Sequence, residues 1–156
     1  MPDPIYLSTI GVHLKYAVEA TAGTRPTTGY TDLVGVKSIP SFSPAPDDLE
    51  TTTLNETEYK TYIPGLKDLG GTLQFTFNLS QEIKDIWDAL MTAHTTAKAA
   101  SKKTWFEISV PGLTDSLFFP GEPSAMGLPE MDVNSVAEVE NSITPVGAPV
   151  WATKST

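Results

Sequence analysis

The alternation of apolar and polar residues between Thr72 and Leu79 is the feature that most constrains the fold. The apolar positions are Leu73, Phe75, Phe77 and Leu79. A period of two places these four side chains on one face of a β-strand and the polar residues on the other. The sequence therefore predicts a half-buried strand, in a sheet that turns one face toward a core.

The same period of two recurs elsewhere along the chain. It predicts clear strands at residues 12–18 and 106–110, and weaker strands at 32–39, 116–119 and 133–143. In the last segment Glu138 and Glu140 fall on the polar face, while Val139 and Ile143 fall on the apolar face. One face of the sheet is thus expected to meet solvent, as antiparallel sheets allow. The fold class that follows is mainly β.

The segment after Leu79 has a different period. Its apolar residues recur at the i, i+3, i+4 and i+7 spacing of a helix, and they are Ile83, Ile86, Trp87, Leu90 and Met91. Ser80 is suited to cap the first turn, because its hydroxyl can accept a hydrogen bond from a backbone N–H there. We therefore expect one helix, from about residue 81 to about residue 94, against the sheet.

Residues 40–69 fit neither period. Pro44, Pro46 and Pro64 do not support a continuous strand, and the segment is too long for an ordinary connection. It is expected to be a functional loop, or else an extended hairpin around 51–54 and 59–63. Its apolar side chains need a partner surface, and they are Leu49, Leu54, Tyr59, Tyr62 and Ile63.

The length of 156 residues suits a single domain with its own core. The residues beyond Thr144 are expected to form a C-terminal arm, at about 144–156. No apolar run reaches the length of a membrane span. The start of the chain, Met1 to Pro4, lacks the basic and apolar parts of a secretory signal, which predicts synthesis and assembly in the cytoplasm.

The charge of the chain argues against a protein that holds nucleic acid. It has 10 basic and 19 acidic residues, a net charge of -9, whereas phosphate binding needs clustered Lys and Arg. Between Thr104 and Thr153 there are acidic residues but no Lys or Arg. Part of the surface is therefore expected to be strongly negative and to repel DNA.

The search for catalytic and metal-binding patterns predicts no catalytic residue, no metal and no cofactor. The chain has no cysteine, and His13 and His94 lack a second ligand at helical spacing. Both histidines are expected to contact solvent. Asp47 and Asp48 lie in a run without the spacing of a calcium loop. Trp105 lies opposite the core-facing residues of its strand, so it either marks an interface or is covered by another segment.

Two stretches carry a resemblance to a known family. Thr51–Leu54 is followed by Tyr59–Gly70, which ends in the letters PGLKDLG, and then by the alternating strand. This run resembles the signature of major tail tube proteins of long-tailed, non-contractile bacteriophages. The order of elements also agrees, down to the closing segment Pro145–Trp151, so the resemblance covers nearly the whole chain.

The resemblance implies a β-sandwich or barrel with a flanking helix and a long assembly loop. It implies hexameric rings of the chain itself, stacked into a tail tube through which DNA leaves, in the tail of a virion. The tape measure, baseplate or distal tail and tail terminator proteins would be further partners. The long loop would bridge subunits and rings, Trp105 and Trp151 would lie at interfaces, and Glu138 and Glu140 would face the lumen.

Two alternatives remain open from the sequence. One is another protein with the same fold, such as the tube of a secretion system or contractile tail, or a tail terminator. The other is a β-sandwich that decorates a capsid or binds a ligand, and that does not polymerise. An enzyme is the least expected class.

Overall fold

The computed structural model describes residues 7–155, so residues 1–6, which include the start Met1 to Pro4, and Thr156 lie outside the part described. The chain forms two compact units. One comprises the residues up to Pro40 and those from Thr72 onward, and the other comprises Ser41–Gly71.

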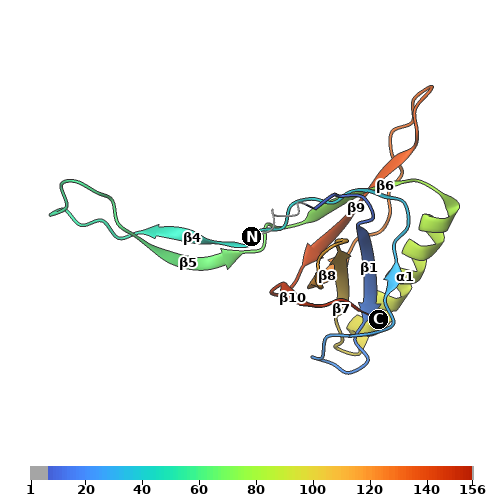
Figure 1. Cartoon of the computed structure of the whole chain (residues 1–156), viewed down its shortest axis with the longest axis horizontal. Coiled ribbons are helices and arrows are strands. Elements are labelled where there is room, and N and C mark those ends of the chain that lie inside the picture. Colours follow the sequence, from blue (N-terminus) through green and yellow to red (C-terminus); the bar gives the residue numbers. More distant parts are fainter. Residues whose placement is uncertain (1–6, 156) are drawn as a thin grey trace, which may run out of the picture. The chain divides into compact units, whose positions relative to one another are not determined.

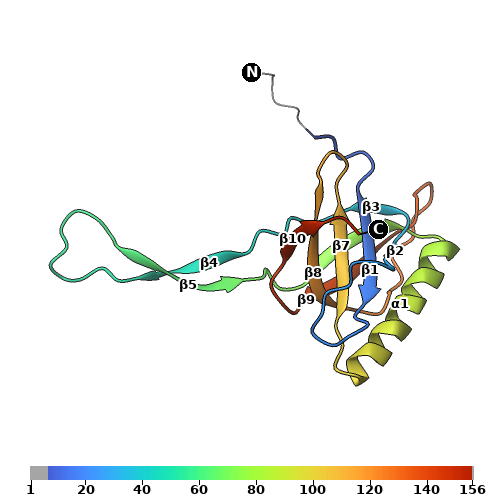
Figure 2. The same cartoon turned by 60° about the horizontal axis from the view of Figure 1, so that its bottom comes forward.

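The larger unit is an antiparallel sheet that curls into a half-barrel, with one helix (Figures 1 and 2). This confirms the mainly β fold class. The strand order is β2-β1-β7-β8-β9-β6-β3, and β10 pairs with β8 beside β9. The strands are β1 (His13–Val18), β2 (Thr31–Asp32), β3 (Val36–Ser38), β6 (Leu73–Asn78), β7 (Thr104–Ser109), β8 (Asp115–Pro123), β9 (Glu138–Pro145) and β10 (Val150–Thr153).

The alternation in β6 produces the burial that it predicts. Leu73, Phe75 and Phe77 are buried, whereas Gln74 and Asn78 are exposed. The same face continues across the sheet through cross-strand partners, and its buried members include Leu14, Phe106, Phe119, Val139 and Ile143. One face of the sheet therefore builds the core, which helix α1 covers.

Helix α1 spans Gln81–Ala99. The Ser80 hydroxyl accepts a hydrogen bond from the Ile83 N–H at 3.3 Å, as the capping prediction requires. The expected end near residue 94 is too early, because His94 and Ala97 continue the buried stripe by another turn. Histidine and alanine are weakly apolar, so the helical pattern of large apolar residues in the sequence stops at Met91.

Trp87 is the centre of the contact between helix and sheet. It is fully buried, its ring meets Phe77 edge-on at 5.9 Å between centroids, and its indole N–H donates to the Ser124 carbonyl at 2.8 Å. The helix is thus fixed to β6 by packing and to the end of β8 by a hydrogen bond.

Two expectations about the end of the chain are corrected. The strand expected at 133–143 begins only at Glu138, and the residues before it form an exposed loop in which Asn134 has a positive φ of 61°. The expected C-terminal arm contains strand β10, which pairs with β8 from Val150 to Thr153. This edge strand has only four residues, too few for an alternation to stand out in the sequence.

The smaller unit is a two-stranded hairpin of β4 (Ala45–Glu50) and β5 (Tyr62–Asp68). A hairpin was one of the two expected forms, although its strands lie farther from the tip than predicted. Pro46 and Pro64 lie within the strands. Each strand of a two-stranded ribbon has a free edge, where the missing N–H of proline costs no ladder hydrogen bond.

Candidate assembly surfaces

The hairpin exposes every apolar side chain that the sequence singled out in it. The exposed fractions run from about half to complete, for Leu49 at 50%, Leu54 at 104%, Tyr59 at 75%, Tyr62 at 51% and Ile63 at 52%. Leu66, at 88%, belongs with them and was missed, because it lies inside the PGLKDLG run. An isolated two-stranded hairpin is only marginally stable in water. That this surface meets a partner stays a prediction.

Threonine hydroxyls organise the tip of the hairpin. The Thr51 N–H donates to the Thr61 carbonyl at 2.8 Å, and the Thr61 N–H donates to the Thr52 hydroxyl at 2.9 Å. These bonds continue the β4–β5 ladder beyond its last paired residues. The threonine-rich stretch thus holds Leu54 and Tyr59 out in solvent on a defined turn.

Glu138 and Glu140 lie on the sheet face opposite the core, where the alternation of β9 places them. Their cross-strand partners on β6 are Asn78 and Thr76, which are polar as well. Lys37 of the neighbouring β3 forms a salt bridge with Glu138, a partner that the sequence did not reveal. Glu140 remains exposed without a salt bridge among the described residues.

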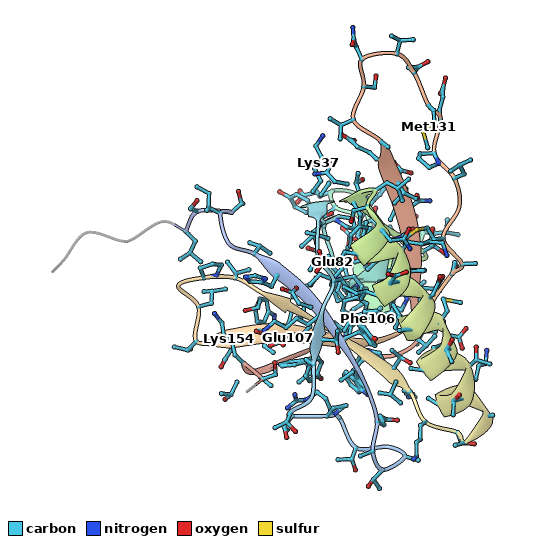
Figure 3. All side chains as sticks on the ribbon, turned by 90° about the vertical axis from the view of Figure 1, so that its right-hand side faces the viewer. Lys37, Glu82, Phe106, Glu107, Met131 and Lys154 are labelled. Atoms are coloured by element: carbon cyan, nitrogen blue, oxygen red, sulfur yellow. The ribbon has the colours of Figure 1, made fainter. Side chains whose placement is uncertain are left out.

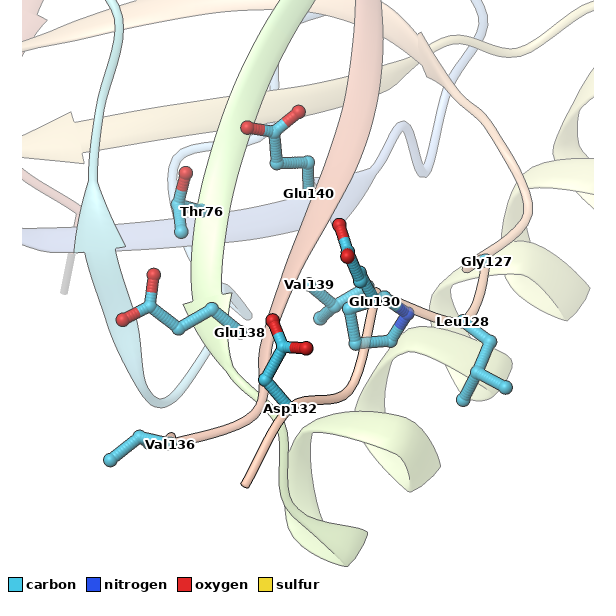
Figure 4. Close-up of a pocket in the computed structure, with 10 residues that line it drawn as sticks. Thr76, Gly127, Leu128, Glu130, Asp132, Val136, Glu138, Val139 and Glu140 are labelled. Atoms are coloured by element: carbon cyan, nitrogen blue, oxygen red, sulfur yellow. The ribbon is translucent and has the colours of Figure 1, made fainter. Parts of the chain in front are cut away.

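A groove lies over the start of β9 (Figure 4). It has a volume of about 630 Å³, and Glu138 and Glu140 line it together with Glu130 and Asp132 of the preceding loop. Within residues 7–155 no group of three or more acidic or histidine side chains is arranged to hold a metal ion. Because these carboxylates line it, the groove is a negative surface.

The two tryptophans differ in exposure. Trp105 is half-buried, and its indole N–H donates to the buried carboxylate of Glu19 at 3.2 Å. Trp151 on β10 is 61% exposed and lines an open groove with Arg25 and Lys154. The role of each at an interface stays a prediction, and the exposed face of Trp151 is the more available.

The two histidines also differ, and one expectation about them is wrong. His13 is exposed and lies 3.0 Å from Asp32. His94 is buried rather than solvated, and its Nδ1 lies 2.9 Å from the Thr104 hydroxyl. Burial lowers the pKa of His94; the Glu122 carboxylate opposes this shift, and Lys98 adds to it. His94 fits a role in fixing the helix to β7.

A second buried cluster on the non-core face was not foreseen. Glu107 is buried and accepts hydrogen bonds from the N–H and hydroxyl of Ser155. Tyr30 packs edge-on against Phe118, and burial raises its pKa to about 12. Figure 3 shows Phe106 on the helix side of β7 and Glu107 beside Lys154 on the other side. The C-terminal residues thus close over this part of the sheet.

The comparisons with known proteins identify the fold. No model of a protein family and no curated protein matches the chain. Among solved structures, a chain of the six-fold symmetrised anti-feeding prophage baseplate matches with a TM-score of 0.61 at 10% identity, covering 98% of both chains.

Two further structures share this fold. A chain of the tail of an empty GTA particle, with C6 symmetry, has a TM-score of 0.57 at 12% identity and covers 91% of this chain and 96% of its own. A chain from the PVC sheath/tube terminator of an extracellular contractile injection system has a TM-score of 0.60 at 13% identity and covers 98% of both. The chain is therefore similar along nearly its whole length to components of tails and baseplates.

Within the described residues, no helix has the length and apolar character needed to cross a membrane.

Proposed function

We infer that the chain is a structural subunit of a phage-type tail, which forms hexameric rings with copies of itself and stacks them into the tail tube. The observation that supports this most is the shared fold over at least 91% of each chain with tail and baseplate components, two of them described with six-fold symmetry. The hairpin supplies the exposed surface that such assembly requires.

The assignment to a non-contractile tail rests on the resemblance of Thr51–Gly70 to tube proteins of such phages. A contractile tail tube or a tail terminator is the second candidate, because one matched structure is a sheath/tube terminator of a contractile system. The two differ in growth, since a tube protein polymerises and a terminator stops at one ring. In either case the place of the protein is the virion tail, assembled in the host cytoplasm, with baseplate, terminator and tape measure proteins as its partners.

Negative-stain microscopy of the purified protein, with size-exclusion chromatography and light scattering, tests the proposal. We expect rings or striated tubes, if necessary after seeding with a baseplate. Discrete rings that never elongate would favour a terminator. A monomer at all concentrations and salt conditions, with or without a seed, would contradict the proposal.

The polar sheet face is proposed to line the lumen. Ring symmetry would repeat Glu140 around the channel and sum the fields of its copies, so that phosphates would slide past a like-charged wall. Changing Glu138 and Glu140 to Lys should preserve assembly but slow DNA release, most strongly at low salt, where screening is weakest. Because Lys37 already pairs with Glu138, Glu140 should account for most of the effect.

The measurement is genome release in vitro from phage that carries the double substitution, across salt concentrations. The single variants Glu138→Gln and Glu140→Gln separate the two positions. Normal tails with wild-type release at every salt concentration would reject the lumen position. Loss of tails would place these residues at an interface instead.

A further inference from the structure

The two ends of helix α1 carry opposite unpaired charges. At its N-terminal end, Ser80 and Gln81 adjoin the start of the loop 127–136, which we call the acidic loop. At its C-terminal end lies a pocket of about 270 Å³ lined by Lys98, Lys102 and Lys103 with His94 and Val146, which we call the basic pocket. A helix of 19 residues separates the two sites by about 28 Å. One chain therefore cannot join its own acidic loop to its own basic pocket.

The acidic loop combines exposed apolar side chains with free carboxylates. Its exposed apolar residues are Leu128 at 82%, Met131 at 57%, Val133 at 92% and Val136 at 72%. Glu130 and Asp132 lie between them and form no salt bridge within residues 7–155. Figure 3 shows Met131 beyond the N-terminal end of the helix. Four exposed apolar residues in one loop are more than scattered surface residues explain, and they indicate a contact surface.

The basic pocket has the complementary properties. Lys98 is already paired with Glu122 at 3.0 Å, but neither Lys102 nor Lys103 forms a salt bridge in the part of the chain that the structure describes. Val146 at its edge is 42% exposed, and the volume suffices for one large apolar side chain. Two free ammonium groups beside such a pocket suit an apolar residue flanked by carboxylates.

We propose that the acidic loop of one copy docks into the basic pocket of the next copy, head to tail. The contact is heterologous, because different patches meet, and it leaves one free loop and one free pocket at the ends of any stack. Repetition therefore gives a polar filament with a fixed direction. The inference rests on the proposed tube function, and it specifies how successive copies recognise each other.

Charge reversal tests the contact. Variant A carries Lys102→Glu and Lys103→Glu, so that its loop and its pocket are both acidic. Variant B carries Glu130→Lys and Asp132→Lys, so that both are basic. Each variant alone should need about tenfold more protein to assemble, because each contact loses attraction and gains repulsion. An equimolar mixture of A and B should assemble within about twofold of the wild type, because each loop then meets an opposite pocket.

The matched control is Asp85→Lys with Asp88→Lys, which makes the same change in net charge as variant B on the exposed face of the helix. It should assemble as the wild type does. The readouts are sedimentation and negative-stain microscopy, with circular dichroism to verify folding. Rescue in the mixture supports the contact and shows at once that both variants are folded.

The outcomes separate the two proposals. If the wild type never assembles, the tube function and the contact both fail. If the wild type assembles and A and B assemble equally well, or if their mixture gains nothing over either alone, the head-to-tail contact is wrong while the tube function stands.

Discussion

The two units of the chain use apolar side chains in opposite ways. In the larger unit, Phe75, Phe77, Trp87 and Phe106 are completely buried between sheet and helix. In the hairpin, Leu54, Tyr59 and Leu66 are at least three-quarters exposed. Burying apolar side chains inside the unit stabilises its fold. Exposed apolar side chains can gain the same kind of stabilisation only when a partner covers them. The larger unit is thus stabilised by its own core, whereas the hairpin should be stabilised by contact with a partner.

Removing the hairpin is the change with the largest expected effect. Ala45 and Asp68 are cross-strand partners, so a short Gly-Ser turn can replace residues 45–68. Assembly should be abolished, while the thermal midpoint of the unassembled protein should stay within about 2 °C of the wild type. Light scattering and circular dichroism measure the two. Global unfolding of the shortened chain would mean that the hairpin contributes to the core.

Truncating Trp87 should have the reverse effect. The change Trp87→Ala removes the contact with Phe77 and the bond to Ser124, and it should lower the free energy of unfolding by about 3–5 kcal/mol. Leu54→Ser is the corresponding change at an apolar residue of the hairpin. It should lower the free energy of unfolding by less than about 0.5 kcal/mol, but it should weaken assembly. Urea unfolding of both variants measures the loss of stability, and sedimentation measures the loss of assembly. Equal losses of stability would remove the distinction between the units.

Replacing a polar residue inside the core of the larger unit should have a smaller effect on the free energy of unfolding, and in the opposite direction. Asn141 is 1% exposed, lies between Val139 and Ile143 on the core face, and neither of its amide atoms has a hydrogen-bond partner among the described residues. Asn141→Val should raise the free energy of unfolding by about 1–3 kcal/mol, because it removes an unsatisfied buried amide and suits a strand.

Asn141→Ala serves as the control, since it removes the amide without adding a branched side chain. Urea denaturation gives both values. Destabilisation by both variants would show that the amide is hydrogen-bonded in solution, for example to a buried water.

The sequence could predict those elements in which a local pattern decides the structure. The alternation of β6 and the cap at Ser80 are local, and the structure agrees with both. Helix α1 is longer than predicted. His94 is buried there and its ring contacts the hydroxyl of Thr104 on β7, and no local pattern in the sequence shows this contact. The strand predicted at 133–143 starts too early, because Val133 continues the alternation of Ala137, Val139 and Ile143 in the sequence. In the structure Val133 is exposed in the loop that precedes β9.

The candidate surfaces divide in the same way. The exposed apolar residues of the hairpin could be found because the segment fits no period and yet is apolar. The salt bridge of Lys37 to Glu138 could not, because it joins residues that are distant in the sequence. The same holds for Val146, which the fold brings to the three neighbouring lysines of the basic pocket. Contacts of that kind follow from strand order, which the alternation does not specify.

The smallest expected effect is the pH dependence due to His94. Burial lowers its pKa in the folded state, so the unfolded chain binds the proton more readily. Stability is therefore complete above the unfolded pKa of about 6.5 and declines as the pH falls below it, toward the folded pKa. His94→Gln should reduce this decline, since glutamine does not titrate there, although the loss of the Thr104 contact should lower stability at every pH.

His13→Gln is the matched control, because it replaces a histidine that is exposed on β1 instead of buried at the helix. Thermal midpoints of the three proteins between about pH 8 and about pH 5 give the comparison. A wild-type slope that survives in His94→Gln would assign the pH dependence to other groups. A slope lost in His13→Gln instead would contradict the assignment to His94.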